Sequence, residues 1–409
     1  MSIAKTAGAA GQTGYAPVLF LASLGAGGLA VTFFMYLMWF TAHAGQPIPS
    51  FTTLTAAFAG GGLALKSLIV VAMTGIAVFG AMHIALLVWN LRKLSAFRRT
   101  PAYAQLMASP KAVQIMAVPL TLAMTMNVGF ILGAVFVPGL WEVVEFIFPV
   151  ALAGFALIGL YALKLYLPII TGALHKGGLE TDGPAGLGQL TAPFAFSMVG
   201  VGFSAATAMS HNEVVTAVGL VGASFFGIAA FALTVLLTAS GLRGVLKNGI
   251  SDETAPTLMI AVPIITVLGI LYYRLGKGLD HTFGVPWENG EILSYWAAVV
   301  MGQLFLLIVG FATLRRIDYV GRFVRGEERS PAAYALICPL VAFFVSANFL
   351  IHAGMQKLGL FDTYSVATVA FYLPLVMGHI TAIWMALKLN AKFIFTGRSD
   401  RSAAMIPAK

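Results

Sequence analysis

Few residues of this 409-residue chain have side chains that could do chemistry, and the single cysteine is the most reactive of them. Cys338 is directly followed by Pro339 in the apolar stretch ALICPLVAFF, residues 335–344. A thiol reacts as its thiolate, which needs a wet, electropositive pocket, and apolar surroundings make it inert. Two interpretations follow: Cys338 serves a thiol-dependent protein that handles sulfur or selenium compounds, or it is a cysteine buried for packing.

The seven histidines raise the possibility of haem, which needs two histidines facing each other at matched depth on two helices. His83, His352 and His379 lie in long apolar runs. A redox subunit that binds haem or quinone is therefore a hypothesis, beside ordinary hydrogen-bonded histidines. No P-loop, zinc-ligand spacing or nucleophile motif occurs, so the sequence predicts no enzyme, no resident cofactor and no metal.

Charged residues inside the apolar runs are few and lie near the ends of the runs: Lys66, Glu142, Glu145, Lys164 and Glu213. Ionisable groups within a membrane usually mark function. Because no acid lies at mid-depth in an odd-numbered run, counted from the N-terminus, the sequence argues against a carboxylate proton relay. It also argues against a secondary-transporter site built from broken helices and charged ligands.

The composition places the chain in lipid. Hydrophobic residues make up 59% and charged residues 10%, well below the roughly 25% of a soluble domain. A spanning helix needs about 20 mostly apolar residues, and ten runs reach that length. We expect one all-α integral membrane domain over residues 1–409, whose first run is a retained span and not a signal peptide. The expected spans are 16–42, 64–91, 113–138, 141–172, 188–209, 212–242, 256–274, 293–314, 331–355 and 364–391.

Basic residues predict the orientation of these spans, because cytoplasmic loops are rich in Lys and Arg. With both termini in the cytoplasm, most of the 24 Lys and Arg residues fall on that side. Only Arg274, Lys277 and Lys357 fall in outer links. We therefore expect a multi-pass protein of a bacterial-type inner (plasma) membrane. Its net charge of +9 then reflects topology and contact with anionic lipid, and we expect no nucleic-acid partner.

Proline recurs in every odd-numbered span. A mid-span proline bends the helix and frees a carbonyl, which lipid tolerates where the kink lines a cavity or packs on protein. The recurrence predicts five helical hairpins in a ring, with the kinked odd helices around a central pore; chance occurrence of proline is the alternative. The expected pore kinks are Pro17, Pro119, Pro193, Pro263 and Pro339, and the expected polar lining is Thr121, Ser197 and Ser204.

Two segments carry a resemblance to a known family: APVLFLASLGAGGLA at residues 16–30 and APTLMIAVPIITVLGI at residues 255–270. With the ten spans and the prolines, they are similar to the first and seventh helices of the TehA / slow-anion-channel family, also called tellurite-resistance/dicarboxylate transporters. The resemblance covers nearly the full chain. It implies a pseudo-fivefold pore in each subunit, a homotrimer, and a small-anion substrate such as a dicarboxylate, an oxyanion or an inorganic anion.

In that family a phenylalanine at the kink of the ninth helix blocks the pore, whereas the matching position here is Cys338. The gate candidates are therefore Cys338 itself and the nearby aromatic side chains of helices nine and five. An open path at this level, or aromatic side chains that only pack between helices, are the alternatives. The aromatic candidates are Phe343 and Phe344 in helix nine and Phe194 and Phe196 in helix five. The expected activity is anion transport driven by the anion gradient and the membrane potential.

Overall fold

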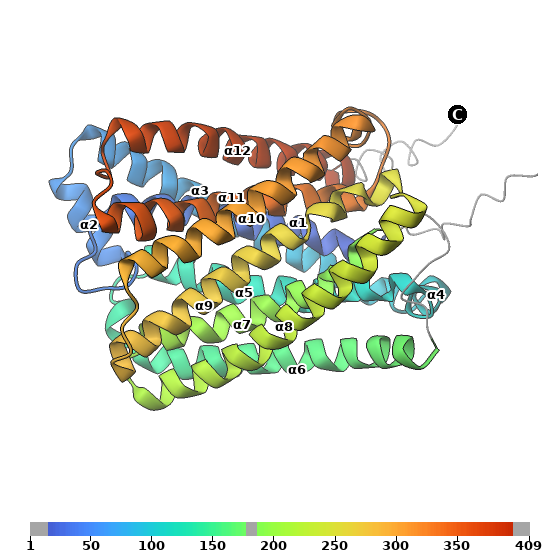
Figure 1. Cartoon of the computed structure of the whole chain (residues 1–409), viewed down its shortest axis with the longest axis horizontal. Coiled ribbons are helices and arrows are strands. Elements are labelled where there is room, and N and C mark those ends of the chain that lie inside the picture. The colour runs from blue at the N-terminus through green and yellow to red at the C-terminus, as the bar shows by residue number, and fades with distance from the viewer. Residues whose placement is uncertain (1–14, 177–185, 396–409) are drawn as a thin grey trace, which may run out of the picture.

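The computed structural model describes residues 15–176 and 186–395, and the regular elements in these ranges are helices. Ten helical spans are long and apolar enough to cross a membrane, which confirms the all-α, multi-pass prediction (Figure 1). The basic residues Lys5, Arg398, Arg401 and Lys409 lie outside the described residues. The spans are Pro17–Phe40, Leu63–Phe97, Pro110–Phe136, Leu140–His175, Gly188–Met209, Glu213–Asn248, Asp252–Phe283, Asn289–Arg316, Pro331–Leu358 and Val366–Ile394.

The odd-numbered spans form the interior of the bundle. In their most apolar stretches, 61% to 89% of the residues are buried, against 28% to 39% in the even-numbered spans. The helices of the odd spans pack in a closed cycle, α1 on α5, α5 on α7, α7 on α9, α9 on α11, and α11 back on α1. Their bounds are α1 (Phe20–Phe40), α5 (Ala117–Phe136), α7 (Thr191–Met209), α9 (Ala261–Phe283) and α11 (Ile337–Phe349).

The even-numbered spans cover this inner cycle and present their other faces outward. They contain α3 (Leu63–Phe97), α6 (Val144–Lys176), α8 (Glu213–Asn248), α10 (Asn289–Arg316) and α12 (Val366–Asn390). Helix α3 packs on α1 and α5, α6 on α5 and α7, α8 on α7 and α9, α10 on α9 and α11, and α12 on α11 and α1. The span that contains α5 has the lowest buried share of the five inner spans, so α5 is the inner helix that its neighbours cover least.

Each inner α-helix begins directly after a short 3₁₀ segment at the same end of the bundle. Pro119, Pro193, Pro263 and Pro339 are each the third residue of the α-helix, and Pro17 opens the 3₁₀ turn before α1. In the first turn of a helix the N–H groups lack intrahelical acceptors, so a proline there removes no helical bond. The prolines therefore stand where the helix type changes, in the first half of each span. The 3₁₀ segments are Pro17–Leu19, Pro110–Met116, Gly188–Leu190, Asp252–Met259 and Pro331–Leu336.

Several segments that were expected to be links are helical. Residues 43–63 contain α2 (Phe51–Gly60), residues 92–112 contain α4 (Pro101–Met107), and Val320–Arg325 form a π-helical turn. Helix α9 continues to Phe283, whereas the seventh span was expected to end at residue 274. The expected tight turn between the third and fourth spans is present, with Gly139 in the left-handed region at φ 70°. The extension of α9 matters most, because it places Arg274 within a helical span and not in a link.

Candidate functional site

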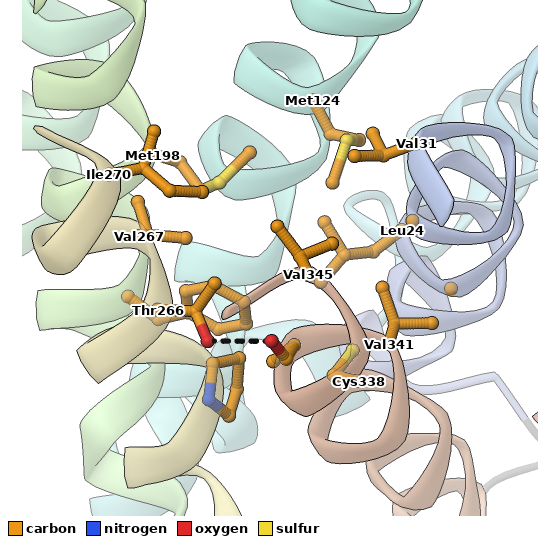
Figure 2. A pocket seen from close by; sticks show the side chains of 15 residues that line it. Leu24, Val31, Met124, Met198, Thr266, Val267, Ile270, Cys338, Val341 and Val345 are labelled. Carbon is orange, nitrogen blue, oxygen red and sulfur yellow. Dashed lines mark hydrogen bonds between the residues drawn. The ribbon is translucent and has the colours of Figure 1, made fainter. Parts of the chain in front are cut away.

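A cavity of about 80 Å³ lies among the five inner helices (Figure 2). Every inner helix contributes to its wall: Leu24 from α1, Met124 from α5, Phe194 from α7, Pro263 from α9 and Cys338 from α11. Because these helices form a closed cycle, the cavity lies on the axis of the bundle. We call it the axial cavity.

The axial cavity offers no free polar group to a ligand. The Thr266 hydroxyl accepts hydrogen bonds from Gln303 Nε2 at 2.5 Å and from Ser346 Oγ at 3.0 Å. It donates to the carbonyl oxygen of Ala342 at 3.1 Å, the bond that is dashed in Figure 2. With its oxygen and proton both engaged, Thr266 presents mainly its carbon atoms to the space. The axial cavity is therefore suited to closure and not to binding.

A second cavity of about 450 Å³, which we call the outer cavity, is lined by α1, α5, α6, α7 and α9. It extends toward the end of the bundle opposite the 3₁₀ segments, where α7 ends at Met209. Five residues line both cavities and therefore lie between them, and Figure 2 shows Met198 and Ile270 across the axial cavity from Met124 and Val31. We call these five the hydrophobic collar. The collar comprises Val31, Met124, Met198, Val267 and Ile270.

Arg274 is the only charged side chain among the described residues that line the outer cavity. Its Nη1 donates to the carbonyl oxygen of Val201 at 3.2 Å. Across residues 15–176 and 186–395, the ion pairs join Lys277 to Asp280 and Arg322 to two other carboxylates, and none of them includes Arg274. A guanidinium inside a membrane span is costly unless it is compensated. An anion in the outer cavity would supply that compensation through charge-assisted hydrogen bonds.

The sequence interpretation missed this role of Arg274, because it assigned the residue to an outer link. The available signal was the character of the residues that follow, RLGKGLDHTF from 274 to 283, which contain no proline and are compatible with a continued helix. A helix that continues past Arg274 draws the side chain back into the span. The rule that basic residues lie outside spans therefore hid the position of Arg274 on a cavity wall.

The structure separates the gate candidates into two groups. Phe194 and Cys338 line the axial cavity, whereas Phe343, Phe344 and Phe196 line neither of the two cavities. Cys338 comes from α11 and Phe194 from α7, so the two inner helices that the sequence singled out do reach the axis.

The other aromatic candidates pack between helices. The Phe344 ring lies 5.3 Å from the Tyr36 ring and 5.2 Å from the His379 ring, between α11, α1 and α12. The Phe196 ring stacks at 6.1 Å on that of Phe226, between α7 and α8. Phe343 is half-buried and packs against the apolar core.

The hydroxyls expected to line the path are engaged elsewhere. Thr121, Ser197 and Ser204 are fully buried and donate to backbone carbonyls three or four residues earlier in their own helices, at 2.7 to 2.9 Å. None of the three lines either cavity. A hydroxyl in an apolar helix needs an acceptor, and the nearest one belongs to its own backbone. A polar residue on an inner helix therefore does not imply a polar pore.

The three histidines of the apolar runs use both ring nitrogens in hydrogen bonds within the protein. These contacts account for their burial without a haem, and a haem iron would have to displace one partner of each ligand. The partners are Ser23 and Thr125 for His83, Gln356 and Tyr372 for His352, and Thr32 and Tyr36 for His379. Within the described ranges, no group of three or more His, Cys, Asp or Glu side chains could hold a metal ion.

Comparison with known proteins adds no family to this picture: no family model matches the chain, and none of the curated proteins matches it. The geometry of the two cavities, the hydrophobic collar and Arg274 therefore carries the argument about function.

Proposed function

We propose that this protein is a membrane channel or transporter for small anions. The path runs along the axis enclosed by α1, α5, α7, α9 and α11, from the outer cavity through the hydrophobic collar to the axial cavity. One observation carries the proposal above the others, namely that Arg274 lines a cavity inside a membrane span without a carboxylate partner in the described chain. That charge attracts an anion and repels a cation.

The collar explains why such a path is closed in this conformation. Narrow hydrophobic constrictions exclude water, and an ion cannot cross them without its hydration shell or a polar substitute. The collar side chains provide no such substitute. Movement of Met124 and Met198 requires only rotation about flexible side-chain bonds. The driving force is the anion gradient together with the membrane potential, which contributes about 2.3 kcal/mol per charge per 100 mV.

The resemblance to the TehA / slow-anion-channel family supplies the wider form of the proposal. By this resemblance we propose that each subunit forms a pseudo-fivefold pore and that the subunits assemble as a homotrimer. We further propose that the protein lies in a bacterial-type inner membrane with both termini in the cytoplasm. The closed cycle of inner helices supports the pseudo-fivefold pore, and the distribution of basic residues supports the cytoplasmic location of both termini. Dicarboxylates, oxyanions and inorganic anions are the substrates that this resemblance suggests. The proposed activity is transport without a catalytic step.

A flux assay in liposomes tests the proposal. Purified protein should carry chloride, nitrate, malate or tellurite faster than empty liposomes do, and should not carry potassium. Arg274→Gln should lower anion flux by about tenfold or more, because a hydrogen bond to a charged group contributes about 1.5–3 kcal/mol. The matched control is Lys277→Gln, since Lys277 lies on the same helix, pairs with Asp280 and lines neither cavity. Folded protein that carries none of these anions would contradict the proposal.

A further inference from the structure

We infer that the outer cavity binds organic monoanions with an apolar body, whose anionic head group pairs with Arg274. This inference rests on the proposed function and narrows its substrate class. It follows from the number of charges in the cavity, from the character of its walls and from its opening.

The number of charges favours a monoanion. Arg274 is the only cation among the described residues that line the outer cavity, and the other lining side chains with hydrogen-bonding groups, Asn127 and Thr125, are neutral. Asn127 Nδ2 donates to the carbonyl oxygen of Ala123 at 3.2 Å, and the Thr125 hydroxyl donates to that of Thr121 at 2.9 Å. The second carboxylate of a dicarboxylate would therefore lack a cationic partner in this cavity, which opposes its burial.

The walls favour an apolar body. Side chains of Met126, Phe130, Leu140, Phe148 and Phe155 line the same cavity as Arg274. Its volume of about 450 Å³ falls within the range of about 300–1,000 Å³ that is typical of pockets for organic ligands. A small inorganic anion would leave most of this apolar surface in contact with water. A ligand with a hydrocarbon or aromatic body would cover it, and removal of apolar surface from water favours binding.

The opening of the cavity gives such a ligand a route through the lipid. The lining includes Gly129 on α5 and Val150 on α6, and both residues are exposed, Val150 to 69%. A Cβ atom at Gly129 would meet no other atom within 4 Å, so there is open space beside this residue. The opening lies beside α5, the inner helix that its neighbours cover least. An apolar body that partitions into the bilayer therefore reaches Arg274 from the side.

A set of matched ligands tests the inference in the full-length protein, reconstituted in nanodiscs of zwitterionic lipid, with empty nanodiscs as the baseline for calorimetry. Octanoate carries both the charge and the apolar body, acetate has only the charge, octanol has only the body, and suberate adds a second carboxylate at the same chain length. Octanoate should bind at least tenfold more tightly than each of the other three. Equal or weaker binding of octanoate than of acetate or suberate would overturn the inference.

Two variants assign the site. Arg274→Gln should weaken octanoate binding by at least tenfold and remove the preference for octanoate over octanol, while Lys277→Gln leaves both unchanged. Gly129→Leu keeps the charge and fills the opening, so it should weaken octanoate more than acetate. Unchanged octanoate binding in both Arg274→Gln and Gly129→Leu would place the ligand outside the outer cavity and overturn the inference. If Arg274→Gln fails to fold, the relative affinities of the four ligands for the unmodified protein, together with octanoate binding to Gly129→Leu, still test the inference.

The flux assay separates this inference from the proposed function. Anion flux that depends on Arg274, together with no preference for octanoate, would retain the transport function and overturn the ligand class. Tight, Arg274-dependent octanoate binding without anion flux above that of empty liposomes would retain the ligand class and overturn transport.

Discussion

The axial cavity and the outer cavity lie on one path but differ in chemistry. In the axial cavity the polar Thr266 is fully engaged by Gln303, Ser346 and a backbone carbonyl, and the walls are otherwise apolar. In the outer cavity Arg274 has only a backbone carbonyl as hydrogen-bond partner among the described residues, and the walls around the cavity are mostly apolar. Under the proposed function, the difference assigns anion recognition to one depth and closure of the path to another.

Separate sites for recognition and closure have a consequence that can be tested. Changes to Arg274 should alter which ions are accepted, and changes to the hydrophobic collar or the axial cavity should alter how fast they pass. If a single residue controlled both properties, this distinction between the two cavities would be wrong.

The largest expected effect comes from filling the axial cavity at Cys338. A small neutral thiol reagent, methyl methanethiosulfonate, applied at alkaline pH so that more of the thiol is ionised, should reduce anion flux to about a tenth or less, because a packed interior has no room for added bulk. Cys338→Ala should keep basal transport and abolish the block. The measurement is liposome flux before and after the reagent, with labelling followed by mass spectrometry.

Two results would contradict this interpretation of Cys338. Loss of transport in a folded Cys338→Ala variant would favour thiol chemistry over a spatial role. Absence of labelling, even when the collar is widened by Met198→Ala, would show that Cys338 is not reached from the path.

The next effect comes from widening the collar. Met198→Ala and Met124→Ala should each raise anion flux by about threefold or more, because a wider constriction is easier to hydrate. The preference for anions over potassium should persist, since Arg274 is unchanged. Met126→Ala is the matched control, because Met126 lines the outer cavity but does not belong to the collar. A rise in that control equal to the rise in the collar variants would remove the collar as the closed point.

A smaller and different effect is expected at Phe344, which is 1% exposed and packs on Tyr36 and His379. Phe344→Ala should lower the free energy of unfolding by about 3–5 kcal/mol, as is usual for a buried phenylalanine, without raising flux per folded molecule. Phe194→Ala, from the wall of the axial cavity, should raise flux. Thermal unfolding in detergent and liposome flux measure the two properties. Higher flux in Phe344→Ala with unchanged stability would return Phe344 to the path.

The class of fold could be predicted from the sequence, because the bilayer imposes a simple rule on length and apolar composition. The recurrence of proline also indicated which helices form the interior. The position of the prolines within the spans was not predictable from the recurrence. Whether a segment is 3₁₀ or α-helical depends on whether each N–H bonds the carbonyl three or four residues earlier. A proline such as Pro119 or Pro339 is compatible with a kink within one helix and equally with a junction between the two helix types.

The candidate site was harder to predict for a physical reason. Side chains reach the axis according to the rotation of each helix, and neighbours such as Phe343 and Phe344 then face in different directions. Hydroxyls such as that of Ser197 satisfy themselves on their own backbone, so their presence did not indicate a polar path. Arg274 needed the true end of α9 before it could be placed in a cavity.

The smallest expected effect lies at the end of the bundle that carries the 3₁₀ segments. Arg322 bonds Glu328 at 2.7 Å and Asp252, the first residue of a 3₁₀ segment, also at 2.7 Å. The Arg322 guanidinium lowers the pKa of the Glu328 carboxyl below its usual range. A lowered pKa means that the pair stabilises the fold above the pKa of an unfolded glutamate, about 4.3. That stabilisation is lost as the pH falls through the lower, folded value.

Glu328→Gln should therefore melt slightly below the unmodified protein at pH 7, and the gap should close as the pH falls from about 5 to 3. The shift should be at most a few degrees, since exposed ion pairs contribute little and are screened by salt. Thermal unfolding at low ionic strength across this pH range measures it. Anion flux at pH 7 should be unchanged, because Glu328 lines neither cavity. A change in anion selectivity in Glu328→Gln would mean that recognition extends to this end of the bundle, and the division between the two cavities would fail.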